Sequence, residues 1–513
     1  MAPALQHGDS SAIEASQALQ KVDRRLIPLL FITYMLAFMD KTILSSAAVF
    51  GLIEDTHLVG QQYSWVSSAF YFGYLLWEWV CSPRSGLPSL QLTDIKPTNF
   101  LIPRVPVAKY LAANTFFWGT VVALTAACVN YGGLLMVRFM LGVAEATITP
   151  AFMFITTTWY TRDEIPIRTG IWFSGNSFGG LMASLLAYGV GHIEHPLRPW
   201  MWLFMILGVV TFFWAFVILA LLPDSISNAT FLTEGEKAFI SDRVVIAGTG
   251  RTEGTKWNTE QAFECFRDPK TWHLLGIVTL LQIPNGGIQN FANLVIKSFG
   301  FTALESTLIN IPVSLISAGT ITLTGWLAGR FRNINCILIA CILAISGLGS
   351  TLVYARVYHV SLGIQLLGYF LLAAGPGALP LTMSLAQTNY MGVTKKMTMT
   401  GSMFVAYCVG NIAGPHLFRA REEGHETSFR SILICYALAA VLTFSLYLYL
   451  RRLNSRRDRE EGMVNTGSAG VPQQPGGRQT GSTEVSPLIR TLSRQDDGDD
   501  VTDWNTFEFR YRL

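Results

Sequence analysis

The sequence predicts an all-α membrane protein in which twelve transmembrane helices form two six-helix bundles. Three observations lead to this fold class. Half of the 513 residues are hydrophobic and only 14% are charged, whereas soluble proteins carry about 25% charged residues. Apolar runs long enough to cross a bilayer, which takes about 20 residues, recur along the chain. A polar segment over residues 223–271 divides these runs into two sets.

Each predicted span is a run of mainly apolar residues between polar or charged ones. The twelve spans are expected near residues 26–50, 63–80, 107–128, 132–158, 165–192, 200–222, 272–296, 305–328, 334–354, 361–382, 397–418 and 429–450. They group into bundles over 26–222 and 272–452, joined by a cytoplasmic linker over 223–271. That linker is too short for a catalytic domain, so an enzyme is not expected.

Both ends of the chain are expected to be tails. Residues 1–25 carry no signal-peptide pattern, so the first span should act as an uncleaved anchor. Residues 453–513 are expected to be a disordered tail, because residues 462–500 are rich in Gly, Ser, Gln, Pro and Asp.

The distribution of Lys and Arg predicts the orientation in the membrane. These residues concentrate in alternate loops and at both ends of the chain, and positively charged loops stay in the cytoplasm. Both termini are therefore expected to be cytoplasmic. The net charge of +3 reflects this bias, and the lack of a basic stripe with interleaved aromatics argues against a nucleic-acid partner.

The cysteines indicate neither metal nor disulfide chemistry. Seven are scattered along the chain, most of them inside predicted spans. Their spacing matches no known metal motif, and no cofactor is expected. The expected partners are the lipid bilayer and a small solute, with the chain functional as a monomer.

Six charged residues fall within or at the ends of predicted spans. A charge at mid-bilayer costs about 2.5–3.5 kcal/mol on insertion scales, so such residues usually face a cavity and pair with one another. The six are Asp40, Lys41, Glu78, Arg138, Glu145 and Lys297. Glu78 ranks lowest, because an acidic residue near the end of a span is more often interfacial.

Arg138 and Glu145 lie seven residues apart in the fourth span, with Gly142 between them. This spacing places both side chains on one helix face, about 10 Å apart along the axis. Arg138 is therefore a candidate ligand for an anionic group, and Glu145 a candidate proton carrier. The alternative is a structural ion pair that packs helices together.

Asp40 and Lys41 interrupt the first span after an apolar run. Neighbouring helical residues point about 100° apart, so the two cannot face the same partner. Asp40 is the better candidate for proton coupling, because intramembrane carboxylates typically act in proton relays. The alternative is that both only pair with neighbouring helices.

The seventh span is unusually polar. Pro284 and Gly286-Gly287 are expected to kink or unwind it beside a cavity. Its candidate binding residues are Asn285, Gln289, Asn290, Asn293 and Lys297. The last three share one face, which suits a polar and anionic solute. The alternative is that the amides join helices.

Two later spans contain glycine–proline breaks. Gly375-Pro376-Gly377 interrupts the tenth span, and Gly414-Pro415 ends the eleventh. Both resemble hinges. Asn411 and His416, beside the second break, are further candidate site residues, although a lone His is more often structural.

Motifs along nearly the whole chain resemble one family. In the first half they are Phe38-Met39-Asp40-Lys41, residues 60–65 and 70–74, Pro97-Thr98-Asn99, Arg138-Phe139 with Gly142 and Glu145, and Leu222-Pro223-Asp224-Ser225. In the second half they are Asn285-Gly286-Gly287, residues 296–301, Gly410-Asn411-Ile412 and the terminal Thr502-Asp503-Trp504 with Phe509-Arg510-Tyr511. The chain thereby resembles the major facilitator superfamily and, within it, the fungal anion:cation symporter family that contains allantoate permease and the nicotinate, pantothenate and biotin carriers.

The resemblance implies proton-coupled uptake of a small organic anion, such as allantoate, another ureide or a vitamin-like carboxylate, at the plasma membrane. Arg138 and Lys297 would contact the anion, with Asp40 or Glu145 as proton carrier. The alternative is a proton-driven exporter of a secondary metabolite. The residues expected to gate the cytoplasmic side are Arg104, Gly325, Arg330 and Arg332.

One segment departs from the family pattern. In the family, the end of the second span runs directly into the Pro-Thr/Ser-Asn motif, whereas here Val80 to Lys96 intervene. We interpret residues 80–96 as the translation of a retained intron, with a real loop insertion as the alternative. Sequencing cDNA across this junction distinguishes the two.

Overall fold

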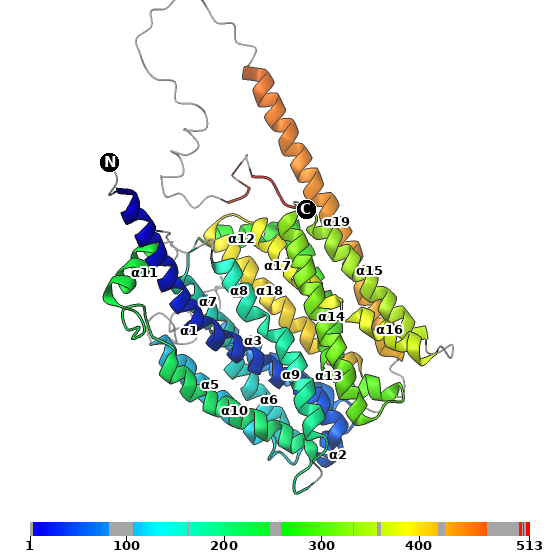
Figure 1. The fold of residues 1–513 in the computed structure, drawn as a ribbon. Helices are drawn as coiled ribbons and strands as arrows, with labels where there is room; N and C mark the ends of the chain where they lie inside the picture. Colours follow the sequence, from blue (N-terminus) through cyan, green and yellow to red (C-terminus); the bar gives the residue numbers. More distant parts are fainter. Residues whose placement is uncertain are drawn as a thin grey trace, which may run out of the picture.

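The structure is a computed structural model. It describes residues 4–81, 106–161, 164–193, 195–246, 258–331, 333–355, 361–418, 426–468, 502–504, 506 and 509–513. Within these ranges the regular elements are helices, and no strand occurs. The helices form two bundles side by side, with the linker helices α11 (Glu234–Ile246) and α12 (Thr259–Arg267) at one end (Figure 1). We call this the linker end and the opposite one the far end.

The first bundle contains the six spans before the linker. Its helices are α1 (Ala4–Ala47) with the π-helical η1 (Ala48–Leu52) and α2 (Ile53–Asp55), α3 (Gln62–Cys81), α5 (Val107–Thr125), α6 (Tyr131–Glu145) with α7 (Ile148–Trp159), α8 (Ile165–Phe173) with α9 (Gly175–Val190), and α10 (Pro199–Leu221). The fourth and fifth predicted spans are thus each divided into two helices.

The second bundle contains the six spans after the linker. Its helices are α13 (Pro269–Ser298), α14 (Ala303–Arg330), α15 (Asn335–Tyr354), α16 (Leu362–Leu372) with η3 (Gly375–Gly377) and α17 (Ala378–Thr388), α18 (Val393–Ala413) with η4 (Gly414–Leu417), and α19 (Glu426–Ser468). The two glycine–proline sequences form the 3-10 turns η3 and η4.

The predicted fold class, twelve helices in two bundles, is confirmed. Eight helical segments among the described residues are long and apolar enough to cross a membrane. Helices α13 and α18 are long enough but less apolar. Both lie at the seam between the bundles, where α13 packs on α1 and α18 on α3. They tolerate polar residues because they face protein on that side.

The expected unwinding of the seventh span is wrong. Helix α13 continues through Pro284 and both glycines to Ser298. The glycines serve close packing instead: a Cβ atom at Gly286 would lie 2.8 Å from the Cα atom of Asn411, and one at Gly287 would lie 2.5 Å from the ring of Phe418. Their missing side chains let α18 and η4 approach α13 without breaking its backbone.

The ends of the chain also differ from expectation. Helix α1 begins at Ala4, so the predicted N-terminal tail is a continuation of the first span. The expectation of a disordered tail from residue 453 is wrong for two parts, since α19 continues to Ser468 and the described residues of 502–513 pack against the second bundle. Helix α3 ends at Cys81, and the rest of the interpreted insert, 82–96, lies outside the described residues.

Candidate functional site

Four charged side chains of α1 and α6 meet inside the first bundle. Lys41 Nζ lies 2.9 Å from Glu145 Oε2, and Arg138 Nη1 donates to the backbone carbonyl of Asp40 at 3.3 Å. Trp118 of α5 donates from its Nε1 to Asp40 Oδ2 at 2.5 Å. The neighbours Asp40 and Lys41 thus turn to different partners: Lys41 pairs with Glu145, whereas Arg138 contacts the backbone carbonyl of Asp40 and Trp118 its carboxylate. We call these four residues the intramembrane charge cluster.

This cluster has unused hydrogen-bonding capacity. Among the described residues, Asp40 Oδ1 and Arg138 Nε and Nη2 are buried without a hydrogen-bond partner. Leaving a buried polar atom unpaired costs about 1–3 kcal/mol, so such atoms indicate a place where water or a ligand binds. The Arg138 guanidinium also stacks over the Phe204 ring at 5.2 Å, a contact that leaves its N–H groups available.

Lys41 is the accessible member of the cluster. Its side chain is 23% exposed, whereas that of Glu145 is 1% exposed. Its Nζ lies over the rings of Phe70 and Tyr74, at 5.2 and 5.8 Å from their centroids. Tyr407 of α18 lies close enough to interact electrostatically with Lys41. Lys41 therefore faces the seam, and both bundles contribute to its surroundings.

Close packing of α3 on α6 fixes the position of the cluster. A Cβ atom at Gly142 would lie 1.9 Å from the carbonyl oxygen of Phe70, and one at Gly73 would lie 2.1 Å from that of Phe139. Both positions require glycine, because the two backbones touch. Gly142 thus brings α3, with its aromatic residues, directly against the helix that carries Arg138 and Glu145.

Two of the predicted binding amides join helices within the second bundle. Asn411 is fully buried and donates to Gln282 Oε1 at 3.1 Å and to the carbonyl of Tyr407 at 2.9 Å. Asn285 donates to Gln282 Oε1 at 3.1 Å and to Asn411 Oδ1 at 3.3 Å. These amides satisfy one another between α13 and α18, which is the alternative considered for them.

Asn290 and Asn293 join the two bundles at the far end. The hydroxyl of Tyr63 in α3 donates to the carbonyl of Asn290 at 2.8 Å, and the side-chain amide of Asn293 lies 2.9 Å from the hydroxyl of Ser46. Nearby, Ser68 of α3 donates to the carbonyl of Ile412 at 2.8 Å. In this conformation both residues close the far end instead of lining a shared site with Arg138.

The remaining predicted residues are dispersed. Gln289 is half-buried, and among the described residues its Nε2 has no hydrogen-bond partner. Lys297 is exposed in the last turn of α13 and is not brought to Arg138. Gly325 and Arg330 are exposed on α14 at the linker end, and no ion pair to Arg330 occurs within the described ranges. Arg104 and Arg332 lie outside the described residues.

Sequence reasoning missed the aromatic residues of the site. Trp118 supplies the hydrogen bond to Asp40, and Tyr71 and Tyr407 meet across the seam with ring centroids 6.1 Å apart. Aromatic residues are common in membrane spans, so nothing in the sequence singled these out.

The sequence is similar to those of known membrane transporters. The profile of the Major Facilitator Superfamily matches residues 30–415. The chain belongs to this superfamily. It is 34% identical to an uncharacterized transporter of Schizosaccharomyces pombe, over 88% of this chain and 82% of that protein. It is 31% identical to the allantoate permease of Saccharomyces cerevisiae, over 96% of this chain and 86% of that protein.

Solved structures of the superfamily share the fold. A bacterial homologue of the human lysosomal transporter Spinster, in an inward-facing and occupied conformation, aligns with a TM-score of 0.60 at 14% identity, covering 82% of this chain and 96% of that one. The xylose transporter XylE of E. coli, in a partially occluded inward-open conformation, aligns with a TM-score of 0.57 at 11% identity, covering 82% and 97%. The chain is therefore a multi-pass membrane transporter of this superfamily and not an enzyme.

Proposed function

We propose that the protein takes up a small organic anion together with a proton, by alternating access between its two bundles. The observation that carries this proposal is the charge balance of the intramembrane charge cluster. Asp40 and Glu145 offset Lys41 and Arg138, so the cluster is neutral when both carboxylates are ionised. Protonation of one carboxylate gives it a net charge of +1, and an anion restores neutrality.

Within this scheme, Glu145 carries the proton and Lys41 binds the anion. Lys41 is the accessible charge and Glu145 is its partner, so protonation of Glu145 frees the ammonium group to pair with solute. Arg138, whose Nε and Nη2 have no hydrogen-bond partner among the described residues, adds a second set of donors. Gln289, whose Nε2 likewise has none within the described part of the chain, is a predicted amide of α13 that is available for solute.

The substrate class follows from these donors. A carboxylate fits the accessible ammonium group of Lys41 and the buried guanidinium group of Arg138, because charge-assisted hydrogen bonds are about twice as strong as neutral ones. The likeness to a permease named for allantoate supports a ureide carboxylate, with vitamin-like carboxylates as further candidates. We propose a monomer as the working unit.

We also propose that the linker end faces the cytoplasm and that the protein lies in the plasma membrane. Lysines and arginines gather there, as expected for cytoplasmic segments. The far-end contacts through Tyr63, Ser68 and Asn293 then close the extracellular side.

The test is uptake of a panel of labelled organic anions, including allantoate, in transporter-deficient yeast at external pH 4.5 and 7.5. We expect accumulation at the acidic pH that collapses when a protonophore is added. Glu145→Gln should retain exchange of anion for anion but lose accumulation, because it mimics the protonated state permanently. Lys41→Gln should lose both. Full accumulation by either variant, or net extrusion from preloaded cells, would contradict the proposal.

A further inference from the structure

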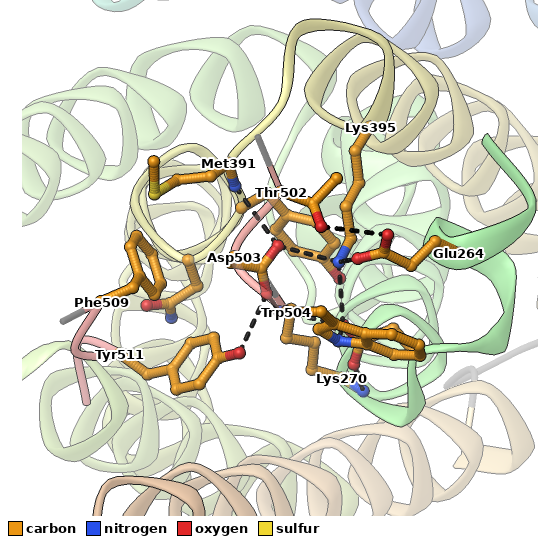
Figure 2. Close-up of polar contacts among 12 residues, drawn as sticks. Glu264, Lys270, Met391, Lys395, Thr502, Asp503, Trp504, Phe509 and Tyr511 are labelled. Carbon is orange, nitrogen blue, oxygen red and sulfur yellow. Dashed lines mark hydrogen bonds and ion pairs between the residues drawn. The ribbon is translucent and has the colours of Figure 1, made fainter. Parts of the chain in front are cut away.

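The described residues of the C-terminal segment, Thr502–Leu513, are docked on the second bundle at the linker end. Figure 2 shows Asp503 at the centre of the contacts. Its carboxylate pairs with Lys270 at the start of α13 and lies 2.8 Å from Lys395 Nζ at the start of α18. Tyr511 donates to the same carboxylate at 2.9 Å. Asp503, Lys270 and Lys395 are each at most 1% exposed.

Backbone contacts fix the rest of the segment. Asn389 and Arg512 exchange two hydrogen bonds of 2.9 and 2.7 Å, and Asn454 of α19 does the same with Tyr511, at 2.9 and 3.0 Å. Arg457 donates to the carbonyl of Asp503 at 2.7 Å. The segment is therefore recognised through its main chain as well as its side chains, as a bound peptide is.

The segment also contacts the linker helix α12. Thr502 donates to Oε2 of Glu264 in α12 at 3.1 Å, and Trp504 donates from Nε1 to Oδ2 of Asp268, the residue between α12 and α13, at 3.0 Å. Lys395 joins the same group through Glu264 at 2.6 Å. Helix α11, by contrast, packs on the first bundle through Lys21 with Glu236 and Arg243 with Glu164. The two linker helices thus belong to different bundles.

Asp503 is a carboxylate partner that two buried lysines share. Lys270 also pairs with Asp268 at 2.9 Å and Lys395 with Glu264 at 2.6 Å, and the segment adds Asp503 to both lysines. Burial raises the pKa of Asp503, but the ammonium groups of Lys270 and Lys395 outweigh this and hold it below its usual value. Removal of Asp503 takes from both buried ammonium groups the carboxylate that they share.

We propose that this face is a binding site for the chain's own C-terminal segment, and that its occupancy stabilises the direct contacts of linker helix α12 with the second bundle, such as that of Glu264 with Lys395. Asp503 is the residue on which binding depends, because it reaches both buried lysines. The neighbouring aromatic rings and the backbone hydrogen bonds fix the register of the segment on the second bundle. The bound segment therefore adds to the contacts that keep α12 with α13 and α18 when the two bundles change their relative positions. This inference is independent of which solute is carried.

The test uses the full chain with a site-specific protease sequence placed within residues 469–501. After cleavage, the purified transporter is passed through a size-exclusion column and the retained C-terminal fragment is quantified. We expect the fragment to co-elute with the transporter. In Asp503→Asn, retention should weaken by at least about a hundredfold, the size expected when a buried charge loses its partner.

Asp458→Asn is the matched control. It removes the exposed ion pair of Asp458 with Arg510 and should weaken retention by less than about fivefold. Loss of the fragment from the unsubstituted transporter, or equal retention in both variants, would overturn the proposal.

Hydrogen exchange gives a second readout that does not require transport. Once the fragment is released, amides of α12 should exchange at least about tenfold faster, because the contact of Thr502 with Glu264 is gone. Amides of α11, which belongs to the first bundle, should be unchanged. Unaltered exchange in α12 would show that the segment does not stabilise it.

Discussion

Two buried clusters of acidic and basic side chains in this transporter differ in how many of their polar atoms have hydrogen-bond partners. In the C-terminal dock, Asp503 interacts with two lysines, a tyrosine hydroxyl and a backbone N–H. In the intramembrane charge cluster, Asp40 Oδ1 and two guanidinium nitrogens of Arg138 have no hydrogen-bond partner among the described residues. A satisfied cluster holds one structure, whereas an unsatisfied one can accept a proton or a ligand.

The largest expected effect is in the unsatisfied cluster. Lys41→Gln leaves Glu145 buried without its cation, and breaking a buried pair costs about 3–5 kcal/mol. We expect loss of uptake and a lower melting temperature in detergent. The double variant Lys41→Gln, Glu145→Gln should regain the melting temperature but not the uptake. Recovery of uptake in the double variant would mean that the pair is only structural.

A smaller effect is expected at Trp118. Trp118→Phe removes the donor to Asp40, and a hydrogen bond to a charged group contributes about 1.5–3 kcal/mol. Trp200→Phe is the matched control. Trp200 Nε1 also donates to a carboxylate, that of Asp55, in a hydrogen bond of 2.7 Å that lies outside the intramembrane charge cluster. Both variants should lose stability in a thermal unfolding assay. Only Trp118→Phe should change the pH profile of uptake. If the two variants have identical pH profiles, Trp118 takes no part in proton coupling.

The amide side chains of α13 and α18 also differ in whether their hydrogen-bonding groups have partners. Asn411→Ala removes partners from Gln282 and Asn285 and should cost about 1–3 kcal/mol of stability, with KM for the anion unchanged. Gln289→Ala removes an unpartnered amide and should leave stability unchanged but raise KM severalfold. Measuring both parameters for both variants tests whether unused hydrogen bonds identify the solute site. A raised KM in Asn411→Ala with lost stability in Gln289→Ala would refute this link between unused hydrogen bonds and the solute site.

The smallest effect is expected from pH at the dock. Because the pKa of Asp503 lies below its usual value, its contribution to docking is complete above about 3.9, the pKa of a free Asp. It is lost only as the pH falls below that value through the lowered pKa. Retention of the cleaved fragment should therefore be the same at pH 7.5 and 5.5. A marked loss at pH 5.5 would mean that another group controls binding.

Hydropathy predicted every span, because crossing a bilayer constrains length and polarity locally. The charged site residues were predictable for the same reason. Their partners were not: whether Asp40 meets Arg138, Trp118 or a lysine depends on how three helices cross, which no local pattern encodes. The sequence indicated six intramembrane charges, and the structure brings four of them together, Asp40 and Lys41 of α1 with Arg138 and Glu145 of α6.

The errors have similar causes. Gly286 and Gly287 can either unwind a helix or admit a neighbour, and the sequence does not distinguish these uses. The composition of residues 462–500 suggested a disordered tail, but Asp503 and Tyr511 gain order from lysines more than 100 residues earlier in the chain. Solute binding by Asn290 and Asn293 stays a prediction, and in this conformation the two residues contact Tyr63 and Ser46 of the first bundle.

Helix α1 has a mechanical consequence. It runs for 44 residues, about 66 Å at 1.5 Å per residue, and carries both Lys21, which touches the linker, and the charged pair deep in the membrane. A rod of this length acts as a lever: a tilt of a few degrees at the charges becomes a displacement of several ångströms at its free end. Distance probes on residue 4 and on the second bundle would therefore report the transport cycle without a label near the solute.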